Sequence, residues 1–196
     1  QKTAYEILSG LVGSEMCIRD RLIAAHFDKN SNSNFLKKIR KNFEKKMDSN
    51  SIYEGVKIVD LTSGLTEPMS ADAVLTFRNL HNWLGSTMDT IFANSFKALK
   101  SGGIFGVVEH RAEAGASIQN MKKSGFVTED HAIEMAKYHG FVLVSKSEIN
   151  SNPKDLKSYE KGVWTLPPSL RLKEKNKAKY LAIGESDRMT LLFKKP

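Results

Sequence analysis

The sequence has a single cysteine, Cys17, among its 196 residues, and this scarcity excludes an intrachain disulfide and any cysteine-rich metal site. It has no apolar run near the roughly 18 residues that a membrane-spanning helix needs, so no membrane span is expected. It also lacks a basic N-terminal segment followed by an apolar one, so no signal peptide is predicted. A cytoplasmic location is favoured, while a secreted or periplasmic one stays open because we expect the natural N-terminus to be missing.

Acidic residues are fewer than basic ones, and 22 Asp and Glu against 30 Lys and Arg give a net charge of +8. The lysines concentrate at 37–46 and 171–179. In the first stretch Leu36, Ile39 and Phe43 recur at helical spacing opposite the lysines, which predicts a solvated helix face. The second stretch alternates charged with other residues and predicts an exposed loop. Neither stretch interleaves aromatic residues with its charges, so a nucleic-acid partner is not expected.

Residues 1–21, QKTAYEILSGLVGSEMCIRDR, show no continuity with the rest of the chain. They closely resemble a peptide that recurs in translated environmental sequence data, where adapter read-through precedes a truncated gene. We interpret them as a non-native artefact and exclude them from functional reasoning. The alternative is a strand, a turn at Gly10 and Gly13, and a helix start that would cradle a phosphate or adenosyl group. Only 14–21 separate that turn from the next predicted strand, fewer than the dozen or so residues of a parallel crossover, so the artefact is favoured.

Residues 22–196 alternate predicted strands with predicted helices. Apolar and β-branched patterns predict strands at 22–27, 56–61, 73–77, 104–108, 141–144 and 189–193. Helical stripes predict helices that end near 47, 100 and 140, with Ser101, Gly102 and Gly103 ending the second and Thr128 capping the third. This order predicts an α/β, Rossmann-like fold with a mainly parallel sheet covered on both faces. Such sheets bind ligands at the carboxyl ends of their strands.

Two polar clusters follow predicted strands at that edge of the sheet. Residues 78–83, Arg-Asn-Leu-His-Asn-Trp, follow the strand at 73–77 and are expected on a surface loop. Glu109, His110 and Arg111 directly follow the strand at 104–108. Because parallel strands end at the same edge, the two clusters together predict a functional site there. The alternative is that Arg78 and Glu109 pair with each other and only close the edge of the sheet.

The stretches DAVLTFRNLHNW at 72–83 and FKALKSGGIFGVVEH at 96–110 resemble a class I, S-adenosylmethionine-dependent methyltransferase. In that superfamily an acid and two hydrophobic residues start the fourth strand, and a leucine-lysine-proline-glycine-glycine-like turn introduces the fifth. Ser101 stands in place of the proline here. The phrases VVEHRAEAG, YHGF, SEINSNPKD, GVWTLPP and IGESDRMTLLFKKP are similar to a bacterial group described as predicted methyltransferases. The resemblance covers about 22–196 and implies seven strands, the last antiparallel.

The resemblance implies a partial methyltransferase domain over 22–196. The superfamily's first strand and glycine-rich cofactor loop would fall where residues 1–21 stand, so we expect this chain to be an inactive fragment that binds S-adenosylmethionine poorly or not at all. A cofactor-binding role is implied for Asp28 (with His26 as the alternative), Asp60, Leu61, Thr62, Arg78 and Asn79. A place in the acceptor pocket is implied for Trp83, Glu109, Arg111 and Trp164, the last as a pocket wall or a hydrophobic lid.

Methyl transfer from a sulfonium needs alignment of donor and nucleophile, and a base where the acceptor is protonated. His81 or His110 is the hypothesised base because imidazole titrates near neutral pH, and a hydrogen-bonding loop histidine is the alternative for each. No metal is expected. Asp187 and Arg188 are predicted to form an ion pair that orders the turn before the last strand.

The acceptor stays open among small molecules, proteins and nucleic acids, with a small molecule favoured. Two other functions stay open on the same fold: a nicotinamide-dependent oxidoreductase and a non-catalytic binding protein. The ending DRMTLLFKKP, typical of an antiparallel last strand, and the turn at 99–103 favour the methyltransferase.

Overall fold

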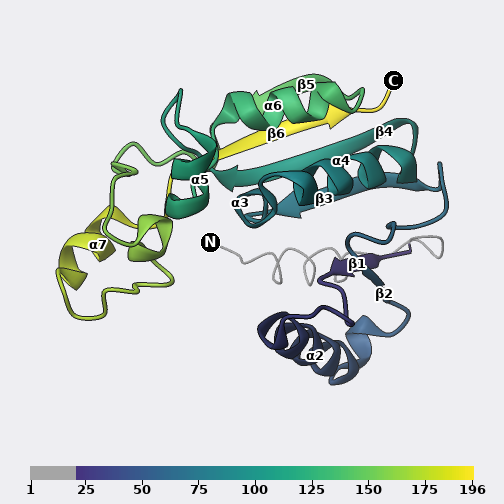
Figure 1. The fold of residues 1–196 in the computed structure, drawn as a ribbon, viewed down its shortest axis with the longest axis horizontal. Helices are drawn as coiled ribbons and strands as arrows, with labels where there is room; N and C mark the ends of the chain where they lie inside the picture. The colour runs from purple at the N-terminus through teal and green to yellow at the C-terminus, as the bar shows by residue number, and fades with distance from the viewer. Residues whose placement is uncertain (1–20) are drawn as a thin grey trace. The chain divides into compact units, whose positions relative to one another are not determined.

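The structure is a computed structural model that describes residues 21–196. Both interpretations of the first residues, and the predicted absence of a first strand and glycine loop, therefore fall outside the described residues. The chain divides into two compact units between Glu67 and Pro68. Figure 1 names the elements of both.

The first unit pairs two parallel strands through a helical crossover. The strands meet with His26 opposite Asp60, so both carboxyl ends lie together. The helix begins where the Ser33 hydroxyl accepts a hydrogen bond from the backbone of Leu36. The elements are β1 (Ile23–His26), α2 (Asn34–Asp48), η1 (Ser51–Tyr53) and β2 (Lys57–Asp60). The predicted strand, lysine-rich helix and strand are confirmed within a few residues.

Arg40 joins the helix to the strands in this unit. Its side chain is 5% exposed, although it carries a charge. The guanidinium donates to the carbonyl of Phe27 and to the carboxylate of Asp60, each at 2.8 Å, and its Nε donates to Glu44 at 2.7 Å. A buried guanidinium needs such partners, since an unpaired buried charge is strongly destabilising. Arg40 therefore holds α2 against the ends of both strands.

The second unit is a four-stranded sheet of order β3-β4-β6-β5 with helices. β3 and β4 are parallel, and β6 runs antiparallel to both β4 and β5. The elements are β3 (Ala71–Phe77), α3 (Leu80–Trp83), α4 (Ser86–Ala98), β4 (Leu99–His110), α5 (Ile118–Ser124), α6 (Glu129–Tyr138), β5 (Val142–Ser147), η2 (Gly162–Thr165), α7 (Lys177–Ile183) and β6 (Arg188–Lys194). The predicted sheet with an antiparallel last strand is confirmed.

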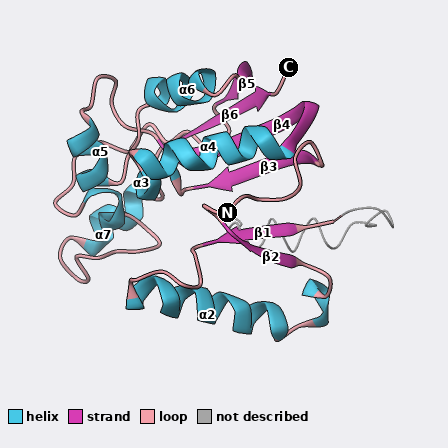
Figure 2. Cartoon of the chain, turned by 45° about the vertical axis from the view of Figure 1, so that its right-hand side comes forward, coloured by secondary structure: helices cyan, strands magenta, loops and turns pink. Residues whose placement is uncertain are grey.

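Helices α4 and α6 cover one face of this sheet (Figure 2). Along β4, Phe105, Val107 and Glu109 are buried, in the alternation of a strand with one covered face. The Phe105 ring centroid lies 5.1 Å from those of Phe92 and Phe141. On the opposite face, apolar side chains such as Leu75 are about half exposed. Within the second unit the described helices thus cover one face of the sheet, not the two expected.

The second predicted helix ends earlier than expected. It stops at Ala98, and Leu99 already belongs to β4, so Gly102 and Gly103 lie within the strand. The backbone N–H groups of Met69 and Ser70 donate hydrogen bonds to the carbonyls of Lys97 and Ala98, respectively, each at 3.0 Å. Because these partners satisfy the last-turn carbonyls, no glycine C-cap is needed there.

Two stretches predicted as loops contain helices. Residues 80–83 form α3, in which Leu80 and Trp83 are buried, and residues 177–183 form α7. The predicted cap at Thr128 is confirmed, since its hydroxyl accepts from the backbone of His131 at 3.2 Å. The loop interpretation of 78–83 was wrong because polar side chains hid the buried Leu80 and Trp83 of α3. Residues 171–176 do form turns, and α7, which begins at Lys177, has no buried residue that could have marked it in the sequence.

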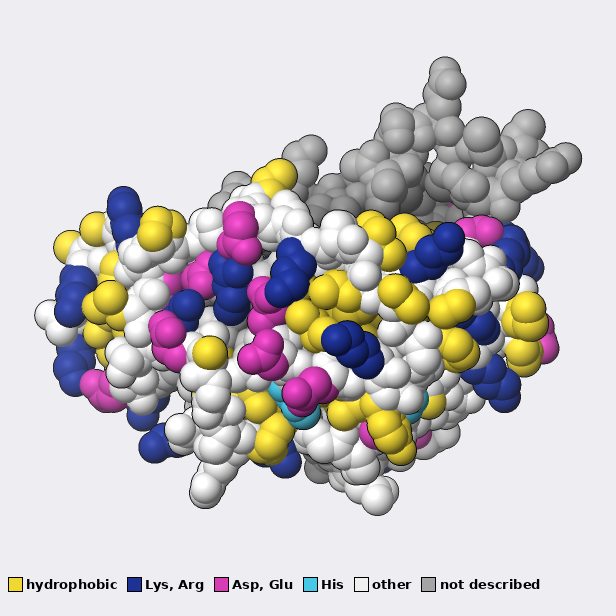
Figure 3. Space-filling view, turned by 90° about the horizontal axis from the view of Figure 1, so that it is seen from above, with side chains coloured by type: hydrophobic (Ala, Val, Ile, Leu, Met, Phe, Trp, Pro, Cys, Tyr) yellow, Lys and Arg dark blue, Asp and Glu magenta, His cyan; other side chains and the backbone are white. Residues whose placement is uncertain are grey.

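The surface carries charges of both signs. Pairs such as Lys175 with Glu160 (2.6 Å) join basic to acidic side chains, and on the face drawn in Figure 3 the two kinds are interspersed. No helix within 21–196 combines the length and the apolar character needed to cross a bilayer.

Candidate functional site

A cavity of about 260 Å³ lies in the second unit, at the carboxyl ends of β3 and β4. In Figure 1 the arrowheads of these two strands point to the end where α3, α5 and α7 gather. The lining comes from Phe77 at the end of β3, Arg78 directly after it, His81 of α3, His110 of β4, and residues within the stretches 163–169 and 185–188. Both polar clusters predicted at this edge therefore contribute to one cavity.

His81 is paired with a fully buried carboxylate. Its Nδ1 lies 3.0 Å from Oε1 of Glu109, a residue with 0% exposure. The backbone N–H groups of His110 and His81 also donate to that carboxylate, at 2.8 and 3.4 Å. A carboxylate only accepts hydrogen bonds, so Nδ1 of His81 carries the proton. Nε2 of His81 then has a free lone pair. The ring lines the cavity, and its hydrogen bond to Glu109 fixes its orientation.

His110 has a different environment, although its ring centroid lies 5.4 Å from that of His81. Its Nδ1 is 2.5 Å from the hydroxyl of buried Ser186. Burial, followed by the charges of His81, Arg78 and Arg188, lowers the pKa of His110 to about 3. His110 is therefore neutral near pH 7 and a much weaker base than a free imidazole.

Arg78 is the first residue after β3 and has a left-handed backbone, with φ of 57°. Its N–H donates to the carbonyl of Val108 at 2.7 Å, which fixes this turn against β4. The half-buried guanidinium makes no hydrogen bond or ion pair with any residue between 21 and 196. The alternative in which Arg78 pairs with Glu109 is wrong, because His81 occupies that carboxylate.

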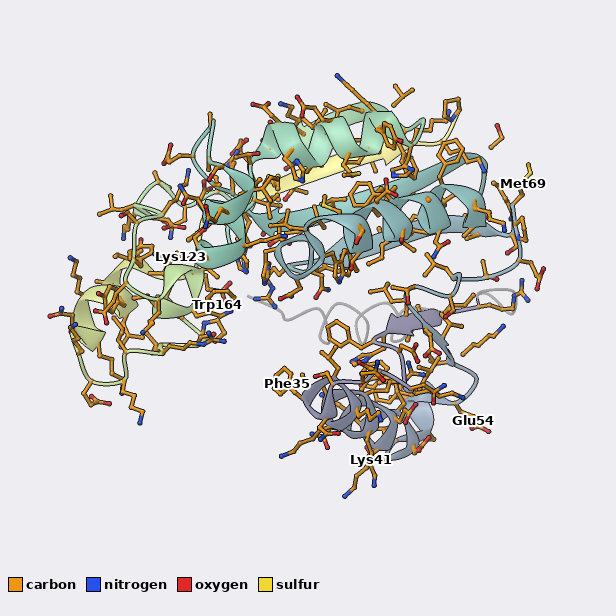
Figure 4. All side chains as sticks on the ribbon, in the orientation of Figure 1. Phe35, Lys41, Glu54, Met69, Lys123 and Trp164 are labelled. Carbon is orange, nitrogen blue, oxygen red and sulfur yellow. The ribbon has the colours of Figure 1, made fainter. Side chains whose placement is uncertain are left out.

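Trp164 of η2 forms part of the cavity wall (Figure 4). Its ring is edge-on to that of His81, with centroids 5.9 Å apart, and the Arg171 guanidinium lies 4.5 Å from its centroid. This cation–π contact fixes the outer face of the ring. Trp164 therefore lines the cavity, where either expected position, a pocket wall or a hydrophobic lid, would place it.

An ion-pair network holds the segment 148–187 to the end of β4. Arg111 binds Asp187 at 2.9 Å and Glu148 at 2.6 Å, and Lys157 reaches Asp187 at 3.0 Å. Burial opposes ionisation of Asp187, but hydrogen bonds from Arg111, Asn152 and Lys157 outweigh it and lower the pKa to about 2. The predicted Asp187–Arg188 pair is wrong. Arg188 pairs with Glu185 instead, since consecutive residues at a strand start point to opposite sides.

Four predicted site residues of this unit lie outside the cavity lining. Glu109 is fully buried and acts on the cavity only through the hydrogen bond that it accepts from His81. Trp83 is 5% exposed and packs in the core. The Asn79 side chain donates to the carbonyl of Phe77 at 3.2 Å, and Arg111 belongs to the ion-pair network. Sequence reasoning did not single out Ser186, the partner of His110. The polar turn GESDR before the last strand is the signal that could have found it.

The predicted cofactor residues of the first unit gather at the carboxyl ends of β1 and β2. Oδ1 of Asp28 accepts from the backbone of Asn30 at 2.7 Å, and Asp60 is bound by Arg40. Leu61 and Thr62 follow β2, and the Leu61 N–H donates to the carbonyl of His26 at 2.8 Å. The other residue weighed for the Asp28 role, His26, stacks on Phe43, with ring centroids 4.6 Å apart. Burial lowers the pKa of His26.

His81, Glu109 and His110 each offer one metal-ligand atom, and these atoms lie within 4.8 Å of one another. Two features oppose a cation there. Glu109 already accepts three hydrogen bonds, and the guanidinium groups of Arg78 and Arg188 lie close enough to His110 to lower its pKa. Positive charge at this range repels a metal ion. The electrostatics of the cavity favour an anion.

Comparison with known proteins finds no family model and no curated protein that matches this sequence. Solved structures do match. The [4+2]-cyclase SpnF has a TM-score of 0.58 at 16% identity, over 98% of this chain and 81% of the cyclase. Geranyl diphosphate methyltransferase in complex with S-adenosylmethionine has a TM-score of 0.53 at 9% identity, over 90% of this chain and 69% of the other.

A third structure is phosphoethanolamine N-methyltransferase 2 of Haemonchus contortus in complex with S-adenosyl-L-methionine. Its TM-score is 0.51 at 16% identity, over 90% of this chain and 43% of the enzyme. These likenesses establish that the chain has the class I methyltransferase fold. One of the matching structures is a cyclase, so the fold by itself does not fix the reaction.

Proposed function

We propose that this fold serves S-adenosylmethionine-dependent methyl transfer to a small acceptor bound in the cavity, with His81 as the base. The observation that supports this proposal is the His81–Glu109 pair at the carboxyl ends of β3 and β4. An imidazole whose Nδ1 proton is held by a buried carboxylate presents Nε2 as a proton acceptor. The same arrangement orients the base in other enzymes.

The residues of the first unit fit the proposed cofactor. When bound, S-adenosylmethionine supplies an electrophilic methyl group on a sulfonium. The second carboxylate oxygen of Asp28 has no hydrogen-bond partner between 21 and 196, so it can accept a ribose hydroxyl. Asp60, Leu61 and Thr62 would border the adenine. Asp60 is the less suited to a hydroxyl because Arg40 already binds it.

In the proposed reaction His81 takes the proton of the acceptor through Nε2 while the acceptor's lone pair forms the new bond to the methyl carbon. The bound cofactor would supply the methyl group and would keep the electron pair of the broken carbon–sulfur bond on its sulfur. Glu109 stabilises the imidazolium that forms. His110, whose pKa is about 3, orients Ser186 or the acceptor by hydrogen bonds and does not compete for the proton.

A second candidate is a reaction without methyl transfer on the same fold, which the similarity to a cyclase favours. The two candidates differ in the fate of the cofactor. Only methyl transfer converts S-adenosylmethionine into S-adenosylhomocysteine in an acceptor-dependent way.

A single-turnover assay with excess protein and methyl-labelled S-adenosylmethionine tests the proposal, because it detects slow transfer even where affinity is low. Because we expect weak cofactor binding by this chain, labelled product from a panel of phenols, amines and carboxylates should form slowly. His81→Gln should slow transfer by about 100-fold or more. His131→Gln, which alters a half-buried histidine of α6 outside the cavity, is the control.

The loss in His81→Gln should shrink at high pH, where a phenolic acceptor ionises without a base. Binding of a nicotinamide cofactor in place of S-adenosylmethionine, detected by saturation-transfer NMR, would contradict the proposal and favour the oxidoreductase. Acceptor turnover without S-adenosylhomocysteine would favour the second candidate.

A further inference from the structure

We propose that the cavity binds a small organic anion, a carboxylate or phosphate on an apolar body, and that Arg78 is the residue that binds the anionic group. The identification of this ligand as the methyl acceptor rests on the function proposed above. The proposal that the cavity binds an anion is independent of that function.

The charged groups at the cavity have partners except at Arg78. Arg188 is paired with Glu185 at 2.5 Å, and the buried carboxylate of Glu109 accepts hydrogen bonds from Nδ1 of His81 and from two backbone N–H groups. Arg78 makes no ion pair or hydrogen bond through its guanidinium with any described residue. A guanidinium that is half removed from water and unpaired is costly, and an oxyanion is its natural complement through two parallel hydrogen bonds.

The backbone at Arg78 supports a role for its side chain. A φ of 57° is unfavourable for a residue with a Cβ, whereas glycine adopts it freely. The N–H bond to the carbonyl of Val108 holds this turn at the mouth of the cavity. A strained position that carries a long charged side chain into a cavity is typical of a binding residue.

The rest of the lining fits an anion attached to an apolar body. Ser169 offers a hydroxyl donor, and so does Ser186 when Nδ1–H of His110 donates to its oxygen. Trp164, Phe77 and the two prolines at 167 and 168 offer flat apolar surface. Arg171 is engaged on the ring of Trp164, which leaves Arg78 as the available cation of the described lining.

The test measures binding to the full chain without cofactor, at constant ionic strength, by titration calorimetry and tryptophan fluorescence. The probes are benzoate, its uncharged analogue benzamide, and inorganic phosphate. We expect benzoate to bind at least about tenfold more tightly than benzamide, since a charge-assisted pair replaces a neutral one. Inorganic phosphate should compete with benzoate, and phosphate binding without benzoate binding would identify a phosphate-specific site.

Three variants accompany the titrations. Arg78→Gln should abolish the preference for benzoate, and Arg78→Lys should keep part of it. Lys123→Gln, which removes an equal charge from an exposed position on α5, should keep all of it (Figure 4). Circular dichroism and the melting temperature establish that each variant folds.

The proposal is overturned if neither anion binds more tightly than benzamide, or if the preference survives in Arg78→Gln. It is also overturned if Arg78→Gln weakens binding of S-adenosylmethionine and not of benzoate, because Arg78 would then bind the carboxylate of the cofactor. Saturable binding of Zn²⁺ that depends on His81 and Glu109 would contradict the charge argument. A chain that prefers anions but forms no S-adenosylhomocysteine would refute the proposed function alone.

Discussion

The two units bury very different side chains. In the second unit Phe92, Phe105 and Phe193 are at most 1% exposed and pack ring against ring. Between 21 and 67 the buried residues are Arg40, Tyr53 and Leu65, and the first of these is ion-paired. A pair of strands with one helix offers little apolar area to bury, so its order depends on polar contacts. The cavity is built on the unit with the aromatic core.

The largest effect is expected from the core of the second unit. Phe105→Ala should lower the free energy of unfolding by about 3–5 kcal/mol, since the ring is fully buried among other aromatics. The matched change in the first unit is Phe35→Ala, where the ring is 69% exposed and a loss below about 0.5 kcal/mol is expected. Urea unfolding followed by circular dichroism measures both. Equal losses would show that the contrast between the units is wrong.

A smaller effect is expected from the ion pair of the first unit. Arg40→Ala leaves Asp60 and the Phe27 carbonyl without their donor and should cost about 2 kcal/mol, because Asp60 is partly exposed and water replaces some of the loss. Hydrogen exchange should accelerate in β1 and β2 and stay unchanged in β4. Lys41→Ala, exposed on the same helix, should change neither. Faster exchange in β4 would show that the two units unfold together.

The smallest effect concerns pH and the second unit alone. Burial lowers the pKa of His110 from 6.5 to about 3. As the pH falls from 6.5 toward 3, this residue is protonated in the unfolded state before it is protonated in the folded state, so the free energy of unfolding decreases over this range. The loss should be about 1 kcal/mol between pH 6.5 and 5.5. The pKa of Asp187 is lowered from 3.8 to about 2, so its contribution is complete above pH 3.8 and is lost toward pH 2.

His110→Asn should remove most of the first slope and leave the second. A smaller slope remains because burial also lowers the pKa of His131. Unfolding free energies from urea titrations between pH 7 and 2 measure both slopes, with Lys123→Gln, exposed on α5, as the control. A first slope that survives undiminished in His110→Asn would assign it to other groups.

The order of strands and helices could be predicted because it rests on local patterns. Short runs of neighbouring residues are enough to recognise the apolar strands that end near Phe77 and Val108 and the helix cap at Thr128. Short helices such as α3 were missed, since its two buried side chains, Leu80 and Trp83, stand in a run of polar ones. The i, i+3 spacing of these two residues was the available signal.

The position of the candidate site was predictable, but its pairings were not. Parallel pairing of β3 with β4 brings the residues after Phe77 next to those after Val108. Which side chain then meets Glu109 depends on the backbone of Arg78, whose left-handed φ no pattern in the sequence indicates. For the same reason Asp187 could not be matched with Arg111, 76 residues away along the chain.

The walls of the cavity have two separate origins. The lining residue His110, and the buried Glu109 that orients His81, belong to β4, a strand of the aromatic core. Trp164, Ser169 and Ser186 belong to a segment tied to that strand through Arg111. Mutations in that segment can remodel the ligand pocket while the proton-accepting pair keeps its geometry. The architecture is therefore suited to diversification, in nature or by directed evolution, through exchange of 148–187 on an unchanged sheet.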